Sequence, residues 1–130
     1  MLIVTIGGQD YELSAKLKTA MAIEKKFKLP LIQIFGKIES AEIPELAGIL
    51  ALAAGKADDP ALREAMLDAW DYNDLQTAVQ ELLANIMFQG SADEIERKLE
   101  KYPASDETKN VLRGLLGIPK KTLPAPTPEA

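Results

Sequence analysis

The chain alternates short apolar segments with residues that start or stop helices, and this succession limits its fold more than any other feature. Over residues 14–117, apolar side chains recur at intervals of three and four, the spacing of one face of an α-helix. Gly, Pro or a capping residue separates each segment from the next. The pattern predicts a mostly α fold of about six helices joined by short connections.

The N-terminal residues follow a different pattern. Apolar residues alternate with others over 2–6, Gly7-Gly8 follows, and alternation resumes over 9–13. A Gly-Gly pair supplies the positive φ angles that a tight turn needs, so we expect a β-hairpin over 1–13 and an α+β fold class. Because an isolated hairpin is marginally stable in water, its apolar face must cover helices or pair with another chain.

Capping residues and apolar stripes place the helices. In the first helix, to about residue 28, the expected inward stripe is Leu17, Ala20, Ile23 and Phe27. The ambiguous run 29–35 is interpreted as a short helix that ends at Gly36. The expected N-caps or capping pairs are Ser14, Asp59 before Pro60, Asn73 with Gln76, Ser91 with Glu94, and Ser105.

Two parts of the chain are distinguished by composition. Residues 1–117 are long enough for a single domain with one core. Four prolines interrupt residues 118–130, which have little to bury, so we expect a flexible, partly extended and disordered Pro-rich tail there.

The composition excludes most catalytic chemistry. The chain has no Cys and no His, so it has no thiolate nucleophile, imidazole base, disulfide or Cys/His zinc site. The stretch 48–56 fails as a phosphate-binding loop because its glycines are wrongly spaced and Ala57 replaces the Ser or Thr. The acidic pairs 58–59 and 93–94 lie at helix starts, where carboxylates cap free N–H groups. We expect no enzyme activity, no cofactor and no metal.

No targeting or membrane segment is expected either. The longest nearly uncharged stretch, 43–56, contains Pro44, Glu45 and Gly48 and is too short to span a bilayer. The apolar opening residues lack the basic leader of a signal peptide.

The net charge of -5 hides a division along the chain. Residues 14–40 hold six Lys against two Glu, a balance of +4, whereas residues 41–75 hold eight Asp and Glu against one Lys and one Arg, a balance of -6. Opposite potentials attract and orient surfaces, so the asymmetry favours internal docking or contact between copies. Two ordinary solvated faces are the alternative.

Two sets of residues are candidates for partner binding. The first is a basic face opposite the stripe of the first helix, formed by Lys18, Lys25, Lys26 and Lys28. These lysines hint at nucleic acid, but no arginine lies nearby and the next segment is acidic. The second set is apolar and adaptable: Met66, Trp70, Tyr72, Met87 and Phe88. Core packing is the expected role for most of the second set, which leaves Tyr72 and Phe88, beside predicted helix ends, to face a partner.

The N-terminal hairpin contains Tyr11-Glu12-Leu13, the helix over 17–27 follows, and Ile43-Pro44-Glu45-Leu46 opens the next helical block. In this order the features resemble the phage tail assembly chaperone family over roughly residues 1–90. It implies a protein of tailed phages, prophages or gene transfer agents, present in the host cytoplasm and absent from the mature virion. The implied partners are the tape measure protein and the tail tube protein, with no role for nucleic acid or a membrane.

The resemblance also implies a second gene product in many members, made by ribosomal frameshifting into a longer form. Lys120-Lys121 would fit a run of A codons at such a site, and two solubilising lysines are the plain alternative. Two other functions stay open from the residues. One is a small nucleic-acid-binding regulator that uses the Lys-rich helix, and the other is a structural virion connector.

Overall fold

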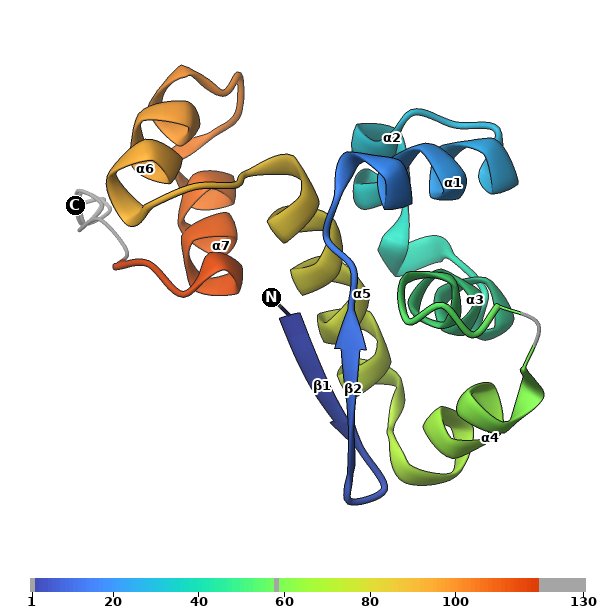
Figure 1. Cartoon of the computed structure of the whole chain (residues 1–130). Coiled ribbons are helices and arrows are strands. Elements are labelled where there is room, and N and C mark those ends of the chain that lie inside the picture. Colours follow the sequence, from blue (N-terminus) through green and yellow to red (C-terminus); the bar gives the residue numbers. More distant parts are fainter. Residues whose placement is uncertain (1, 58, 120–130) are drawn as a thin grey trace, which may run out of the picture. The chain divides into compact units, whose positions relative to one another are not determined.

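The structure is a computed structural model that describes residues 2–57 and 59–119. These residues form an N-terminal β-hairpin and seven α-helices (Figure 1), against about six helices expected, and the mostly helical fold class is confirmed. Contacts divide the chain into two compact units, residues 1–87 and 88–130, which we describe separately. The single domain over 1–117 stays a prediction, and the tail beyond residue 119, with Lys120-Lys121, lies outside the described residues.

The hairpin forms where the alternation predicts it. β1 (Leu2–Ile6) pairs antiparallel with β2 (Gln9–Leu13). Gly7 and Gly8 have φ angles of 59° and 82°, which side chains with a Cβ rarely adopt, and this allows the two-residue turn. The buried side chains of the hairpin are Val4, Ile6 and Leu13.

α1 (Leu17–Phe27) begins later than predicted, and Ser14 is not its N-cap. The Ser14 N–H donates to the carbonyl oxygen of Ala53 at 2.9 Å, and its hydroxyl accepts from the Thr19 hydroxyl at 2.7 Å. Because both groups of Ser14 are engaged elsewhere, Lys16 occupies the cap position without a side-chain hydrogen bond.

Leu17 was predicted to face the core, and this is wrong. The buried face of α1 consists of Thr19, Ala20 and Ile23, and Leu17 lies about 120° around the helix from Ile23. Leu17 is 72% exposed as a result. Phe27, at the other end of the predicted stripe, packs partly buried against the core.

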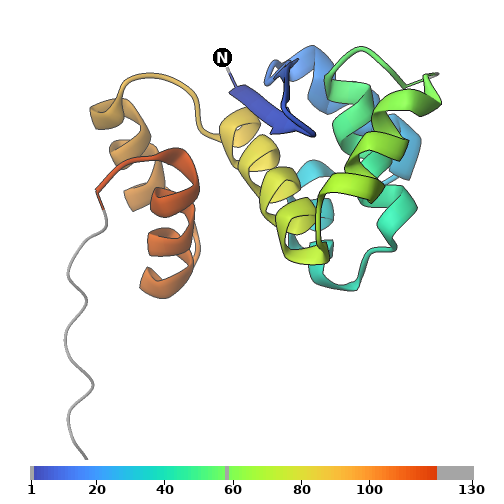
Figure 2. The same ribbon diagram turned by 90° about the horizontal axis from the view of Figure 1, so that it is seen from below.

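α3 (Ile43–Ala53) is the central helix of the first unit. It is preceded by α2 (Leu31–Gly36), which confirms the interpretation of the ambiguous run, and by a short 3-10 turn, η1 (Ile38–Ser40). Every residue from Leu46 to Ala51 is buried, so α3 has no solvent face over that stretch. Its most extensive packing is against α5, and Figures 1 and 2 show the hairpin lying along α5 as well.

α4 (Pro60–Ala69) starts as predicted, because the Asp59 carboxylate accepts from the Ala61 N–H at 3.0 Å. Leu62 and Met66 of α4 are buried. Trp70 was expected to continue the helix, but it has an extended backbone and forms the C-cap.

α5 (Tyr72–Met87) is the longest helix described, but the predicted capping pair Asn73 and Gln76 is wrong. The reciprocal cap is made by two aspartates instead: Asp71 Oδ1 accepts from the Asp74 N–H at 2.8 Å, and Asp74 Oδ2 accepts from the Asp71 N–H at 3.1 Å. Since Asp caps a helix as well as Asn does, the earlier site is used, and Asn73 falls inside the helix.

The second unit contains α6 (Ala92–Lys101) and α7 (Asp106–Leu116). Both predicted caps are confirmed, since the Ser91 hydroxyl accepts from the Glu94 N–H and the Ser105 hydroxyl accepts from the Thr108 N–H, each at 3.2 Å.

Arg113 of α7 joins these two helices. Its Nε and Nη2 donate to the two carboxylate oxygens of Glu96 on α6, at 2.9 and 2.7 Å. The side chain of Arg113 is only 3% exposed, and its Nη1 donates to Asn110 at 2.8 Å. The hydrogen bond to Glu96 raises the pKa of Arg113, so the guanidinium stays charged in its buried position.

Candidate functional site

The most unusual surface of the first unit is the outer side of α1. Leu17 and Met21 are 72% and 69% exposed, the two largest exposed fractions among the exposed large apolar residues described. They are four residues apart and therefore stand one turn apart on the same side of the helix. Lys18 and Lys25 line one flank of this pair, and Lys28 follows at the C-terminal end. We call these five residues the α1 docking face.

Lysines dominate this face because the one acidic residue of α1 is engaged elsewhere. The Glu24 carboxylate accepts a hydrogen bond from the N–H of Leu31 at 2.8 Å. That N–H is the first in α2, whose cap residue Pro30 offers no side-chain acceptor. Glu24 therefore caps α2 and holds it against α1.

Lys28 has an unusual backbone for a residue with a side chain. Its φ of 54° is in the left-handed region, and it is the single residue other than Gly within 2–57 and 59–119 with a positive φ. A helix that ends in this conformation usually places Gly there. The chain instead keeps a cation at the C-terminus of α1, where the helix dipole favours positive charge.

Lys26 does not belong to this face, although it was predicted to lie with the other three lysines. Its Nζ is 3.1 Å from the position that a Cβ on Gly48 would occupy. The side chain thus extends over α3, with its Nζ 6.0 Å from the centroid of the Phe27 ring. Gly48 provides the space for this lysine.

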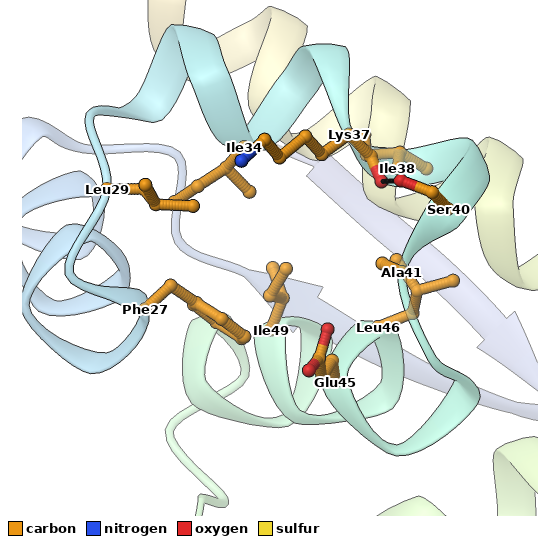
Figure 3. A pocket seen from close by; sticks show the side chains of 10 residues that line it. All are labelled: Phe27, Leu29, Ile34, Lys37, Ile38, Ser40, Ala41, Glu45, Leu46 and Ile49. Atoms are coloured by element: carbon orange, nitrogen blue, oxygen red, sulfur yellow. Dashed lines mark hydrogen bonds between the residues drawn. The ribbon is translucent and has the colours of Figure 1, made fainter.

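A pocket with a volume of about 130 Å³ lies between the end of α1, α2, η1 and α3. Figure 3 shows its walls, which are largely apolar. A cavity of this order can hold one aromatic ring or one large aliphatic side chain. The lining residues are Phe27, Leu29, Ile34, Lys37, Ile38, Ser40, Ala41, Glu45, Leu46 and Ile49.

Two charged side chains face each other across this pocket. In Figure 3, the Glu45 carboxylate points into the opening from α3, and the Lys37 side chain lies along the opposite wall near Ile34. Among residues 2–57 and 59–119, neither side chain forms an ion pair. The pocket therefore combines an apolar interior with one positive and one negative group at its opening.

Tyr72 is the most accessible of the apolar residues predicted to bind a partner. It is 42% exposed, and its hydroxyl donates a long hydrogen bond of 3.4 Å to the carbonyl oxygen of Ala41. Ala41 is one of the residues that line the pocket. The Tyr72 ring therefore lies near that opening, on the first turn of α5.

The other four apolar candidates are covered to different degrees. Met66 is 2% exposed and belongs to the core, and Trp70 packs partly buried against it. Met87 is half-buried at the end of α5. Phe88, expected to face a partner, is instead 6% exposed and packs edge-to-face on Tyr102 with ring centroids 5.3 Å apart.

Leu17 and Met21 were missed as candidate site residues. The lysine spacing held the signal that could have identified them, since Lys18, Lys25 and Lys28 fall on one side of a helical projection and Leu17 and Met21 fall among them. An apolar residue that shares a face with three lysines is exposed on geometric grounds.

The described residues give no sign of a metal centre or a membrane span. Across residues 2–57 and 59–119, no three acidic side chains gather closely enough to hold a metal ion. In the same ranges, no helix has the length and apolar character needed to cross a bilayer.

Comparison with known proteins gives no relative. No family model, no curated protein and no solved structure matches this chain.

Proposed function

We propose that this protein is a non-catalytic tail assembly chaperone, which binds the tape measure protein in the host cytoplasm and recruits tail tube subunits. The observation that carries the protein-binding part is the α1 docking face. Exposed side chains as large as Leu17 and Met21, close together on one helix, are typical of a surface that another protein covers. Burying each would contribute about 2 kcal/mol to association.

The proposed family rests on the resemblance. The residues that carry the resemblance form a hairpin, a helix over Leu17–Phe27 and a helix that begins at Ile43. The pocket beside η1 adds a second place where an apolar side chain of a partner can be held. These features support a protein that works by binding other proteins.

The lysines of the same face favour a second candidate, a small nucleic-acid-binding regulator. Phosphates are bound by Lys and Arg, and their binding weakens steeply as salt rises. Leu17 and Met21, which belong to the same face, have no role in contacting phosphates, which is why we prefer a protein partner. Titration with duplex DNA at low and high salt separates the two functions.

Co-purification tests the proposed function. Tagged protein is expressed with the large helical protein encoded nearby and with the tail tube protein, and finished particles are then searched for the tag. We expect capture of both partners and no tag in the particles. Failure to capture the large helical protein contradicts the proposal, and firm retention in particles indicates a structural virion connector instead.

A further inference from the structure

The α1 docking face has the geometry of a ridge that fits the groove of another helix. Leu17, Met21 and Lys25 follow one another at intervals of four residues, and such rows form the ridges that pack into grooves between helices. Both apolar side chains stand clear of the first unit's core. The ridge is therefore available to a helix from another molecule.

The lysines of the α1 docking face are not paired with carboxylates of the described chain. Within residues 2–57 and 59–119, none of Lys18, Lys25 and Lys28 forms an ion pair. Glu24, the one acidic residue of α1, is bound to the first N–H of α2. A complementary surface must supply negative charge beside its apolar residues.

We propose that the α1 docking face binds an amphipathic helix of a partner protein, in which apolar residues one turn apart are flanked by Asp and Glu. This deepens the proposed function and rests on it in one respect, namely that the helix belongs to the long protein that is chaperoned. The apolar row of the partner covers Leu17 and Met21, and its carboxylates pair with Lys18 and Lys25.

A contact of this size is weak when it occurs once. Helices that cross through such ridges touch over only two or three turns, which buries much less than a standard protein interface. We expect a dissociation constant of about 10 µM or higher for a single helix. A partner that repeats the motif gains affinity through multiple contacts with several copies of the chaperone.

Peptide titration of the full chain tests the chemistry directly. The probe is a synthetic helix of about 20 residues with a Leu row flanked by Glu. One control peptide replaces every Glu by Lys, and the other replaces every Leu by Ser. We expect the acidic amphipathic peptide to bind and both controls to bind at least about tenfold more weakly. If the Ser peptide binds as tightly as the acidic amphipathic peptide, the face binds polyanions in general. If the Lys peptide binds as tightly, the face does not recognise negative charge. Either result overturns the proposal.

Surface variants test whether the peptide binds at the α1 docking face. We expect at least about tenfold weaker peptide binding both in a variant with Lys18→Glu, Lys25→Glu and Lys28→Glu and in a variant with Leu17→Ser and Met21→Ser. The matched control, Lys56→Glu with Arg97→Glu and Lys101→Glu, makes the same change of net charge at exposed positions elsewhere and should bind within about twofold of the wild type. Circular dichroism checks that all variants stay folded. Unchanged binding in either α1 variant contradicts the assignment of the face.

Two further outcomes separate this inference from the proposed function. If the wild type captures the large helical protein and the α1 variants capture it equally well, the chaperone function survives and the inference fails. If the peptide binds as expected but the large helical protein is not captured, the inference survives and the proposed function fails. Self-association that Leu17→Ser with Met21→Ser abolishes would assign the face to a second copy of the chain and overturn the inference.

Discussion

The second unit and the outer side of α1 use positive charge in opposite ways. In the second unit, Arg113 is buried and bound by both oxygens of Glu96, and Lys98 and Lys109 donate to backbone carbonyl oxygens at 2.6 and 3.2 Å. On α1, three exposed lysines lie beside two exposed apolar side chains and form no ion pair within residues 2–57 and 59–119.

This difference separates charge that holds the fold together from charge that is left for another molecule. A buried guanidinium must be paired, because an isolated buried charge costs several kcal/mol. Exposed lysines contribute little to stability, so their placement beside an apolar pair is not explained by folding. Removing the buried, paired charge should therefore cost stability in the second unit, whereas removing the exposed charges of α1 should cost partner binding.

The largest effect is expected at Arg113. Replacing Arg113 by Ala leaves the Glu96 carboxylate without its bidentate partner and should lower the free energy of unfolding of the second unit by about 3 kcal/mol. Urea unfolding of the full chain, followed by hydrogen exchange of α6 and α7, measures the change.

Arg97→Ala is the matched control, because Arg97 is an exposed arginine on α6. It should change stability by less than about 0.5 kcal/mol. Similar effects of the two substitutions would remove the distinction between charge that holds the fold and charge that does not.

A smaller effect is expected at Glu24, the acidic residue of α1 that does hold the fold. Glu24→Ala removes the acceptor for the Leu31 N–H and should destabilise the first unit by about 1 kcal/mol, and Glu24→Gln, which keeps an acceptor oxygen, should cost less. Thermal unfolding of the wild type, Glu24→Ala and Glu24→Gln ranks the stability of the three proteins. Glu39→Ala, at an exposed position of η1, is the control, and a larger loss there than at Glu24 would contradict the capping role.

Lys28 offers a substitution in which stability and binding should move in opposite directions. Lys28→Gly relieves the left-handed backbone and should raise stability by about 0.5 to 1 kcal/mol. The same change removes one cation from the α1 docking face and should weaken binding of the acidic peptide. Denaturant unfolding and peptide titration on one preparation measure both. A loss of stability would show that the lysine side chain itself supports the end of α1.

The smallest effect is expected at Glu81 of α5, a partly buried carboxylate that extends the comparison of buried and exposed charge to an acidic group. Burial raises the pKa of Glu81 above its ordinary value of 4.5. The folded chain therefore binds the proton on the Glu81 carboxyl more tightly than the unfolded chain does. Protonation of Glu81 stabilises the fold, and this stabilisation is complete below pH 4.5 and is lost as pH rises through the raised pKa. Glu81→Gln should be more stable than the wild type at neutral pH, and the difference should shrink in acid. A difference that does not vary with pH would contradict this cause.

The sequence predicted the fold well where local signals decide the structure. The Gly7-Gly8 turn, the Asp59 cap and the Ser91 and Ser105 caps depend on residues within a few positions of one another, and each was confirmed. Such signals act before distant parts of the chain meet.

The predictions failed where distant contacts decide. Ser14 is a good capping residue, but its N–H is bound by Ala53, far along the chain, and no local pattern reveals this. Asp71 and Asn73 are both suitable caps, and choosing between them requires knowing where α4 ends. Phe88 looked accessible beside a helix end, but it packs against Tyr102.

The sequence predicted the basic part of the candidate site but not its apolar part. Lysine spacing predicted a basic face, and the structure keeps three of the four lysines on it. In the apolar pair beside these lysines, Leu17 was assigned to the core and Met21 was left out, because periodicity counts apolar residues without showing which side of a helix its neighbours cover.

The hydrogen bond from Leu31 to Glu24 also has a mechanical consequence. Glu24 sits one turn from Lys28 and fastens α1 to the first turn of α2, the helix that supplies Ile34 to the pocket wall. A partner that shifts α1 therefore also shifts α2, through this carboxylate as well as through the packing between the two helices. Binding of a partner to the α1 docking face and the width of the pocket are therefore coupled through the hydrogen bond between Glu24 and Leu31.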